Sequence, residues 1–334
     1  MIIVASYTVA VFMCFITMLC WGSWANTQKL AGREWRFQLY YWDYAIGVLL
    51  LSLILALTMG SFGGAGRSYR ADVIQASGAS LWSAFLGGVI FNLSNILLVA
   101  AIDIAGMAVA FPIGVGLALA LGVITNYAAA PVGNPVLLFT GVTCVVAAIV
   151  FDAMAYRRLP SRGSKTTTKG IVISVLAGLL MGFFYRFVAD SMSPDFANPE
   201  AGKLGPYSAV VLFSTGLFIS NLLWNSIMMV RPLTGDRVAF RDYIRQGTPR
   251  LHWIGILGGM IWGVGMSFSI IASGAAGFAI SYGLGQGATM IAALWGVFIW
   301  KEFKDAPKGT NGLLGVMFAA YAVGLGLIIV SRFA

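Results

Sequence analysis

Amide side chains inside long apolar runs are the first residues of this sequence that could bind a small molecule. Asn92 and Asn95 lie three residues apart, so a helix would place them on one face, and Gln286 lies within another run. An amide offers two donors and an acceptor, which suits a neutral, hydrogen-bonding solute. The alternative is that these amides join packed helices. The two interpretations are equally supported for these three residues, whereas helix joining is favoured for Asn221 and Asn225.

Aromatic rings supply the second kind of contact, because their flat faces can stack on a sugar ring or a planar heterocycle. A belt at the membrane interface is the alternative, and it fits Trp24, Trp42 and Trp300 near the ends of runs. Other aromatic residues lie deeper or recur at corresponding positions. The predicted substrate-binding residues are Trp21, Asn92, Asn95, Phe111, Tyr185, Trp262, Tyr282 and Gln286.

Ionisable residues that could couple transport to an ion are few. Asp43 is the coupling candidate, although an acidic residue at a helix start is also favoured by the helix dipole. We expect Asp103 in a tight outer turn and Asp152 near the inner end of the fifth run, both in structural roles. His252 is the single histidine of the chain. Histidine metal sites and catalytic triads are thereby excluded, and we expect no enzyme activity, metal or cofactor.

The composition sets the environment of these residues. Of the 334 residues, 59% are hydrophobic and 10% are charged, whereas a soluble domain has about 25% charged residues. Most of the chain must therefore lie in lipid. The net charge of +9 is interpreted as membrane topology and contact with anionic headgroups rather than nucleic-acid binding.

Ten apolar runs are long enough to cross a bilayer, which takes about 20 residues each. The predicted spans are 3–24, 41–60, 80–101, 105–126, 133–155, 168–189, 206–230, 252–273, 276–300 and 311–332. The connection at 231–251 is equally compatible with a helix on the membrane surface and with a solvated basic loop.

An internal repeat organises the spans. A gapless shift of 171 positions brings Trp82–Gly141 onto Trp253–Gly312, with seven identical matches. Because five spans separate the copies, the second copy is expected upside down, as two inverted five-helix repeats. We expect the first repeat at 1–156, a cytoplasmic linker at 157–169 and the second repeat at 170–334. Glycines such as Gly114 and Gly285 in the fourth and ninth spans favour close helix packing over a broken helix by about two to one.

Lysine and arginine residues predict the orientation. Sixteen of the 21 lie in connections on one side, which the positive-inside rule makes cytoplasmic. Both termini are then non-cytoplasmic, in a multi-pass protein of the cell inner (plasma) membrane. We expect a monomer or a homodimer, two states between which the sequence does not distinguish.

The sequence resembles the plant ureide permeases and the related bacterial glucose/ribose porters of the drug/metabolite transporter superfamily. The resemblance covers nearly the whole chain. It rests on Trp21-Gly22 and Trp24, Asp43-Tyr44, Leu57 to Gly60, Gly87-Gly88, Asn92 to Ser94, Gly106, Asn126-Tyr127, Arg231-Pro232, Gly235, Ala275 to Ala279, Trp295-Gly296 and Lys301 to Lys304. The family often has glycine where this chain has Lys301, and the plant members have a longer central loop.

The resemblance implies the ten-helix drug/metabolite transporter fold and proton-coupled uptake of a small neutral solute. Heterocycles such as allantoin or a nucleobase are typical of the plant branch, and monosaccharides of the bacterial branch. We expect the heterocycle, with monosaccharide uptake as the alternative. Drug or metabolite export is less favoured, because a cation would need a carboxylate at mid-membrane. A channel is weakly supported, because an inverted repeat indicates alternating access.

Overall fold

A computed structural model gives the fold of residues 1–32, 35–159 and 168–333. These described residues are helical, and their one strand-like feature is an isolated bridge between Met192 and Leu204. Ten helical segments are long and apolar enough to cross a membrane. The all-helical class and the ten predicted spans are thereby confirmed, with boundaries that differ by a few residues. The protein is a multi-pass membrane protein.

The ten spans are built from more than ten helical pieces, because some of them are interrupted. In chain order the elements are α1 Tyr7–Ser23, α2 Ala25–Ala31, α3 Phe37–Leu57, α4 Tyr69–Gln75, α5 Gly78–Ala105, α6 Met107–Ala110, η1 Phe111–Val115, α7 Gly116–Ala129, α8 Pro135–Tyr156, α9 Thr168–Ser191, α10 Pro206–Val230, α11 Phe240–Gln246, α12 Pro249–Ala276, α13 Phe278–Gly285, α14 Ala288–Leu294, η2 Trp295–Ile299 and α15 Thr310–Val330.

The longest helices, α5 and α12, have 28 residues each and begin and end in similar ways. The side chains of Ser77 and Thr248 accept hydrogen bonds from backbone N–H groups in the first turn, as helix N-caps do. Each helix stops at a glycine, Gly106 with φ 80° and Gly277 with φ 86°. This left-handed backbone conformation favours glycine. At both glycines the chain turns sharply into the next span.

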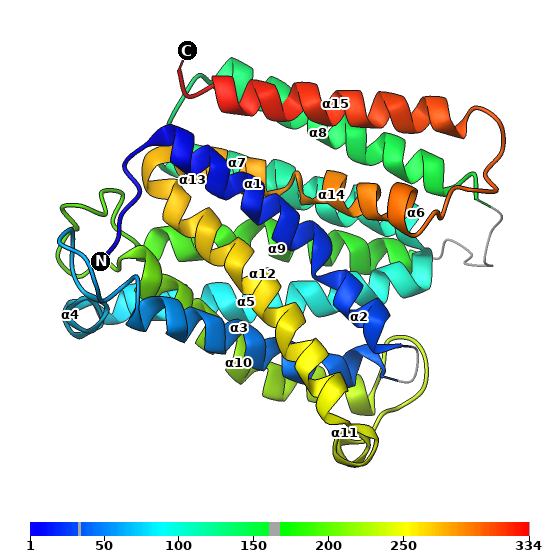
Figure 1. The fold of residues 1–334 in the computed structure, drawn as a ribbon, viewed down its shortest axis with the longest axis horizontal. Helices are drawn as coiled ribbons and strands as arrows, with labels where there is room; N and C mark the ends of the chain where they lie inside the picture. Colours follow the sequence, from blue (N-terminus) through cyan, green and yellow to red (C-terminus); the bar gives the residue numbers. More distant parts are fainter. Residues whose placement is uncertain (33–34, 160–167, 334) are drawn as a thin grey trace.

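Two crossings form the centre of the bundle, where α5 packs against α9 and α10, and α12 packs against α1 and α3. A Cβ atom on Gly88 would lie 1.9 Å from the backbone oxygen of Phe213, and one on Gly259 would lie 2.0 Å from that of Tyr44. Glycine therefore lets each long helix touch the backbone of its neighbour. The helices α8 and α15 pair at one edge of the bundle (Figure 1).

The fourth and ninth spans are interrupted. The fourth passes from α6 through η1, a π-helical turn that contains Pro112, into α7. In the ninth, α13 ends at Gly285 and α14 starts at Ala288, after a turn at Gln286 and Gly287. Gly285 also packs closely on another helix, because a Cβ at this position would lie 2.9 Å from the Trp21 ring of α1. The ninth span is therefore both interrupted and closely packed at this glycine.

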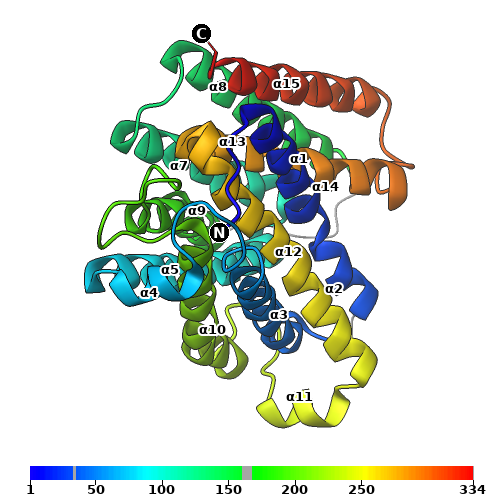
Figure 2. The ribbon, with the colours of Figure 1, turned by 60° about the vertical axis from the view of Figure 1, so that its left-hand side comes forward.

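Both termini lie at the same end of the bundle, here called the terminal end (Figure 1). The Tyr207 hydroxyl donates to the Ile2 oxygen there, at 2.9 Å, and the Asn134 N–H donates to the Ser331 oxygen at 2.6 Å. The opposite end, here called the basic end, contains α2, α11 and the connection between η2 and α15 (Figure 2). The connection at 231–251, for which a surface helix and a solvated loop were both open, contains the short helix α11 over Phe240–Gln246.

The expected position of Asp103 in an outer turn was wrong. The C-terminal part of α5 packs with Leu233, which follows α10, and with Ile173 near the start of α9. Lys169 donates to the Leu233 oxygen at 2.8 Å. Because the third span runs from the terminal end to the basic end, its last turn and Asp103 lie at the basic end.

Candidate functional site

A cavity of about 950 Å³ lies between the helices, within the size range of small-molecule sites. Its lining comes from both halves of the chain. The first half contributes α1, α2, α3, α5, α6, η1 and α8, and the second contributes α9, α10, α12, α14 and η2.

Charged residues at the basic end form the rim of the cavity. Lys29 Nζ lies 3.0 Å from Glu302 Oε1, and Arg36 lies 3.4 Å from an oxygen of Asp236. These side chains are partly or largely exposed, and all four residues line the cavity. Lys29 also lies 4.8 Å from the centre of the Trp300 ring. The cavity therefore opens at the basic end through a rim whose charges are paired.

Aromatic rings form the inner wall. Trp21 and Trp262 are stacked, with centroids 5.9 Å apart and an interplanar angle of 16°. Trp21 Nε1 donates to the Trp262 oxygen at 3.3 Å. Phe91 lies 4.5 Å from Trp262, centroid to centroid. All three line the cavity, so residues from both halves offer ring faces or edges to a solute.

Two of the predicted amides also line the cavity, Asn95 on α5 and Gln286 in the break between α13 and α14. Asn95 Nδ2 donates to the Tyr41 hydroxyl at 3.0 Å, which fixes its orientation and leaves its carbonyl oxygen for another donor. No described residue bonds to the side chain of Gln286, which is 8% exposed. One amide from each half is therefore available to a solute.

Five predicted substrate-binding residues thus line one cavity: Trp21, Asn95, Phe111, Trp262 and Gln286. The other three lie outside the lining described here. Asn92 is fully buried and donates to the Leu217 oxygen and to Ser220 Oγ on α10, at 3.2 and 2.9 Å. It joins two helices, which is the alternative role considered for it.

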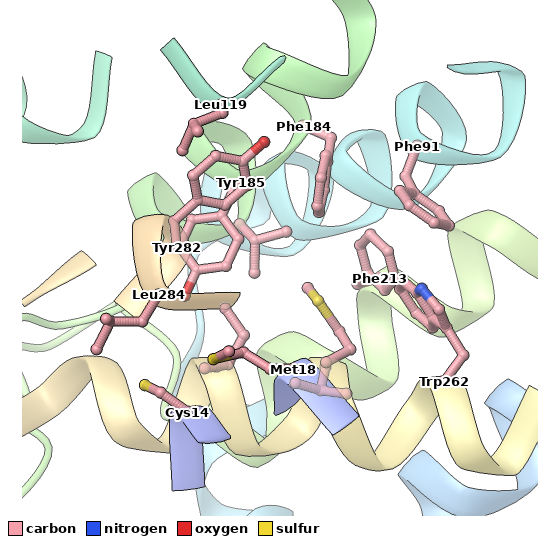
Figure 3. Close-up of a cluster of buried hydrophobic side chains, with 14 of the residues drawn as sticks. Cys14, Met18, Phe91, Leu119, Phe184, Tyr185, Phe213, Trp262, Tyr282 and Leu284 are labelled. Atoms are coloured by element: carbon pink, nitrogen blue, oxygen red, sulfur yellow. The ribbon is translucent and has the colours of Figure 1, made fainter. Parts of the chain in front are cut away.

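Tyr185 and Tyr282 belong to a packed aromatic cluster on the terminal side of the cavity. Figure 3 shows their rings next to each other, with Phe184 nearby, and the two tyrosine centroids are 5.0 Å apart. Tyr185 bonds to Ser269 Oγ at 3.1 Å. The Tyr282 hydroxyl lies 3.2 Å from the backbone oxygens of Ala118 and Met181. These rings close the cavity towards the terminal end.

Asp43, the predicted coupling residue, lies outside the lining and has strong hydrogen-bond partners. Its Oδ1 accepts from the Tyr243 hydroxyl at 2.5 Å, and both carboxylate oxygens lie 3.0 Å from His252 Nδ1. Burial raises the pKa of Tyr243, and the bond to Asp43 raises it further, so the phenol remains a donor. Asp43 thereby attaches α11 to α3 and α12.

Asp103 and Asp152, which we expected in structural roles, line the cavity, and so does Glu302. Asp152 is 4% exposed, and its buried Oδ1 has no hydrogen-bond partner among the described residues. Asp152 could have been noticed in the sequence as an acid within an otherwise apolar run. Its pairing with Glu302 could not, because 150 residues separate them.

The cavity offers binding groups rather than a reactive centre. Among residues 1–32, 35–159 and 168–333, no group of three or more histidine, cysteine, aspartate and glutamate side chains could hold a metal ion. The arrangement of rings, amides and carboxylates can recognise a small polar molecule by stacking and hydrogen bonding.

Comparison with known proteins extends these observations. One solved crystal structure, with 15% sequence identity, matches 98% of this chain and 99% of its own with a TM-score of 0.59. The fold therefore occurs in another protein of known structure.

Curated relatives match over most of their length. Ureide permease 1 of Arabidopsis thaliana is 23% identical over 379 residues, which cover 96% of each protein. Ureide permease 4 of the same plant is also 23% identical, over 99% of each. The sequence model described as ureide permease matches residues 155–331, more than half of the chain. Because these relatives are transporters and the match covers the second half of the bundle, the chain belongs to the ureide permease family of membrane transporters.

Proposed function

We propose that the protein is a secondary carrier that takes up a small neutral oxo-heterocycle of the ureide type by alternating access, coupled to protons. The observation that carries this proposal is the pair of amides, Asn95 and Gln286, in one cavity with the Trp21 and Trp262 rings. A ureide ring has a flat face for stacking, together with N–H and carbonyl groups that amides can bind. The ureide permease names of the curated relatives favour the same substrate class.

The inverted-repeat architecture is part of the proposal. Adding 171 to the bounds of α5 yields those of α12, and adding it to α4 yields α11. The contacts between the two halves follow the same correspondence. The helix α5 of the first half packs on α9 and α10 of the second, and α12 of the second half packs on α1 and α3 of the first. This correspondence supports two repeats, 1–156 and 170–334. Most of the proposed linker, 157–169, lies outside the described residues.

The alternating-access step is supported by one pair of corresponding contacts. A Cβ on Gly122 would lie 2.1 Å from the Tyr282 ring, so α7 and α13 touch at the terminal end. The corresponding positions are Ala293 and Phe111, which both line the cavity. In the opposite state, Phe111 would approach Ala293 and close the basic end. That state would then admit solute at the terminal end.

The orientation follows from the positive-inside rule. We infer that the basic end is cytoplasmic and that both termini lie on the non-cytoplasmic side of the membrane. The present state is then open to the cytoplasm. Uptake would end with release through the rim of Lys29, Arg36, Asp236 and Glu302.

A binding panel tests the substrate class. Thermal unfolding of the purified protein would be measured with allantoin, uracil, glucose and ribose, because a ligand stabilises the folded state according to its concentration relative to its Kd. We expect allantoin or uracil to raise the unfolding temperature more than either sugar. Stabilisation by the sugars alone would contradict the proposal.

Asn95→Ala and Asn92→Ala form a matched pair for the site. Only Asn95 lines the cavity, although the two lie on the same helix. We expect Asn95→Ala to raise the Kd for the stabilising heterocycle, allantoin or uracil, by about tenfold. This is the effect of losing a hydrogen bond of ~1.4 kcal/mol. Asn92→Ala should lower the unfolding temperature and leave the Kd unchanged. A changed Kd for Asn92→Ala alone would place the site elsewhere.

A further inference from the structure

Asp152 differs from the other buried carboxylates of the described chain. Asp43 accepts from Tyr243 and lies against His252. Asp72 accepts from Arg67 Nε at 3.0 Å and from the Gly205 N–H at 2.6 Å. Asp152 is as buried as these two, yet its Oδ1 has no partner and its side chain lines the cavity. It is therefore a buried acid beside the solute path without the donors that a carboxylate charge requires.

We propose that Asp152 is the group that binds and releases the coupling proton. This inference rests on the proposed function and assigns its coupling site to α8 rather than to Asp43. In the opposite state, the transferred proton comes from water at the terminal end and bonds to a carboxylate oxygen of Asp152; in the state described here it returns to water at the basic end. No other bond forms or breaks. Because the solute is neutral, each cycle carries one positive charge.

The surroundings of Asp152 explain why it would accept a proton. Glu302 faces it from the segment after η2, and Glu302 itself is bonded to Lys29 Nζ at 3.0 Å and to the Tyr156 hydroxyl at 2.8 Å. Glu302 thus has two hydrogen-bond donors, whereas the buried Oδ1 of Asp152 has none among the described residues. A negative charge on Asp152 would be buried and unpaired, which is costly. The pair therefore holds one proton most readily on Asp152.

The helices packed on α8, which are α6, η1, α7 and α15, contain no lysine or arginine to replace that proton. Tyr321 on α15 donates its hydroxyl hydrogen to Thr289 Oγ1 at 2.8 Å. The helices α6 and η1 contain no ionisable side chain, and Tyr127 on α7 packs against Phe139 at the terminal end of α8. Asp103 lines the same cavity and adds negative charge. Lys29 is the cation of the cluster, and it pairs with Glu302.

A proton fits this site better than a metal cation does. A divalent metal ion prefers several carboxylate or imidazole ligands, and no group of three or more histidine, cysteine, aspartate and glutamate side chains is found in the described parts of the chain. The repeat gives no second copy of the acid either, since the position 171 residues after Asp152 is Val323. One proton per cycle is the expected stoichiometry.

The test compares wild type with Asp152→Asn in proteoliposomes, with radiolabelled allantoin as the probe. Wild type should accumulate the probe about tenfold for each unit of pH difference, the limit for one coupled proton. Asp152→Asn should lose accumulation, since it cannot titrate, yet keep exchange of internal for external allantoin. Asp43→Asn is the matched control and should still accumulate. Accumulation by Asp152→Asn, or accumulation driven by a sodium gradient, overturns the proposal.

Binding measurements in detergent separate the proposed substrate class from the assignment of the coupling proton to Asp152. The Kd of wild type for allantoin should depend on pH, and that of Asp152→Asn should not. If Asp152→Asn fails to fold, Asp152→Glu decides, because its carboxyl should restore pH dependence with a shifted midpoint; an unshifted midpoint overturns the assignment. A wild type that binds no allantoin refutes the proposed substrate, whereas one that accumulates allantoin equally with and without Asp152 refutes only this inference.

Discussion

Two pairs of residues, 171 positions apart in the sequence, are arranged differently at the two ends of the bundle. At the terminal end, Tyr282 lies against Gly122, and its hydroxyl reaches the backbone of α7 and α9. At the basic end, Phe111 and Ala293 occupy the equivalent positions and both line the cavity. The residue types are similar, an aromatic ring opposite a small residue. The difference therefore reflects how the halves are placed in this state, and only secondarily which residues they contain.

The largest expected effect tests whether the halves really correspond. Gly88→Leu and Gly259→Leu would each push a side chain into the backbone of the neighbouring helix, where no side-chain movement can relieve the clash. We expect both to cost more than the ~1–3 kcal/mol typical of overpacking, and to abolish folded protein in detergent. The measurement is the monodisperse yield by size-exclusion chromatography.

Gly315→Leu is the control for that pair, because this exposed glycine of α15 has open space around its Cβ position. It should behave as wild type. If Gly88→Leu folded normally while Gly259→Leu did not, the two crossings would not be equivalent, and the comparison of the ends would lose its basis.

The next effect separates the packed end from the open end. Tyr282→Ala removes a fully buried ring and should cost about 3–5 kcal/mol in unfolding free energy. Phe111→Ala should cost clearly less, because its ring is only partly buried and lines the cavity. Denaturant unfolding in detergent, followed by tryptophan fluorescence, compares them. Equal losses would mean that Phe111 is packed as tightly as Tyr282, against the open state described here.

The sequence predicted the ten spans well, because they depend on local hydropathy. It could not separate Asn92 from Asn95. Spacing puts both on one face of α5, yet Asn92 meets α10 and Asn95 meets the cavity. The choice is made by neighbouring helices more than a hundred residues away. Tyr282 was expected in the site because it lies deep within an apolar run. Its side chain is instead fully buried in a packed core.

The smallest expected effect concerns the backbone beside the rim. Lys301 has φ 52°, a left-handed conformation that costs a residue with a Cβ about 1 kcal/mol. Lys301→Gly should therefore preserve or slightly raise the unfolding temperature. Lys304→Gly, outside the left-handed region, should lower it slightly through chain entropy. A larger loss for Lys301→Gly would show that the lysine side chain matters more than the backbone strain.

The paired charges at the rim have a consequence for how molecules arrive. Lys29 with Glu302, and Arg36 with Asp236, place opposite charges a few ångströms apart, so their fields largely cancel a short distance into the solvent. These two pairs by themselves therefore provide little electrostatic steering. They would not sort metabolites by charge, and that discrimination would take place after desolvation, against the rings and amides inside.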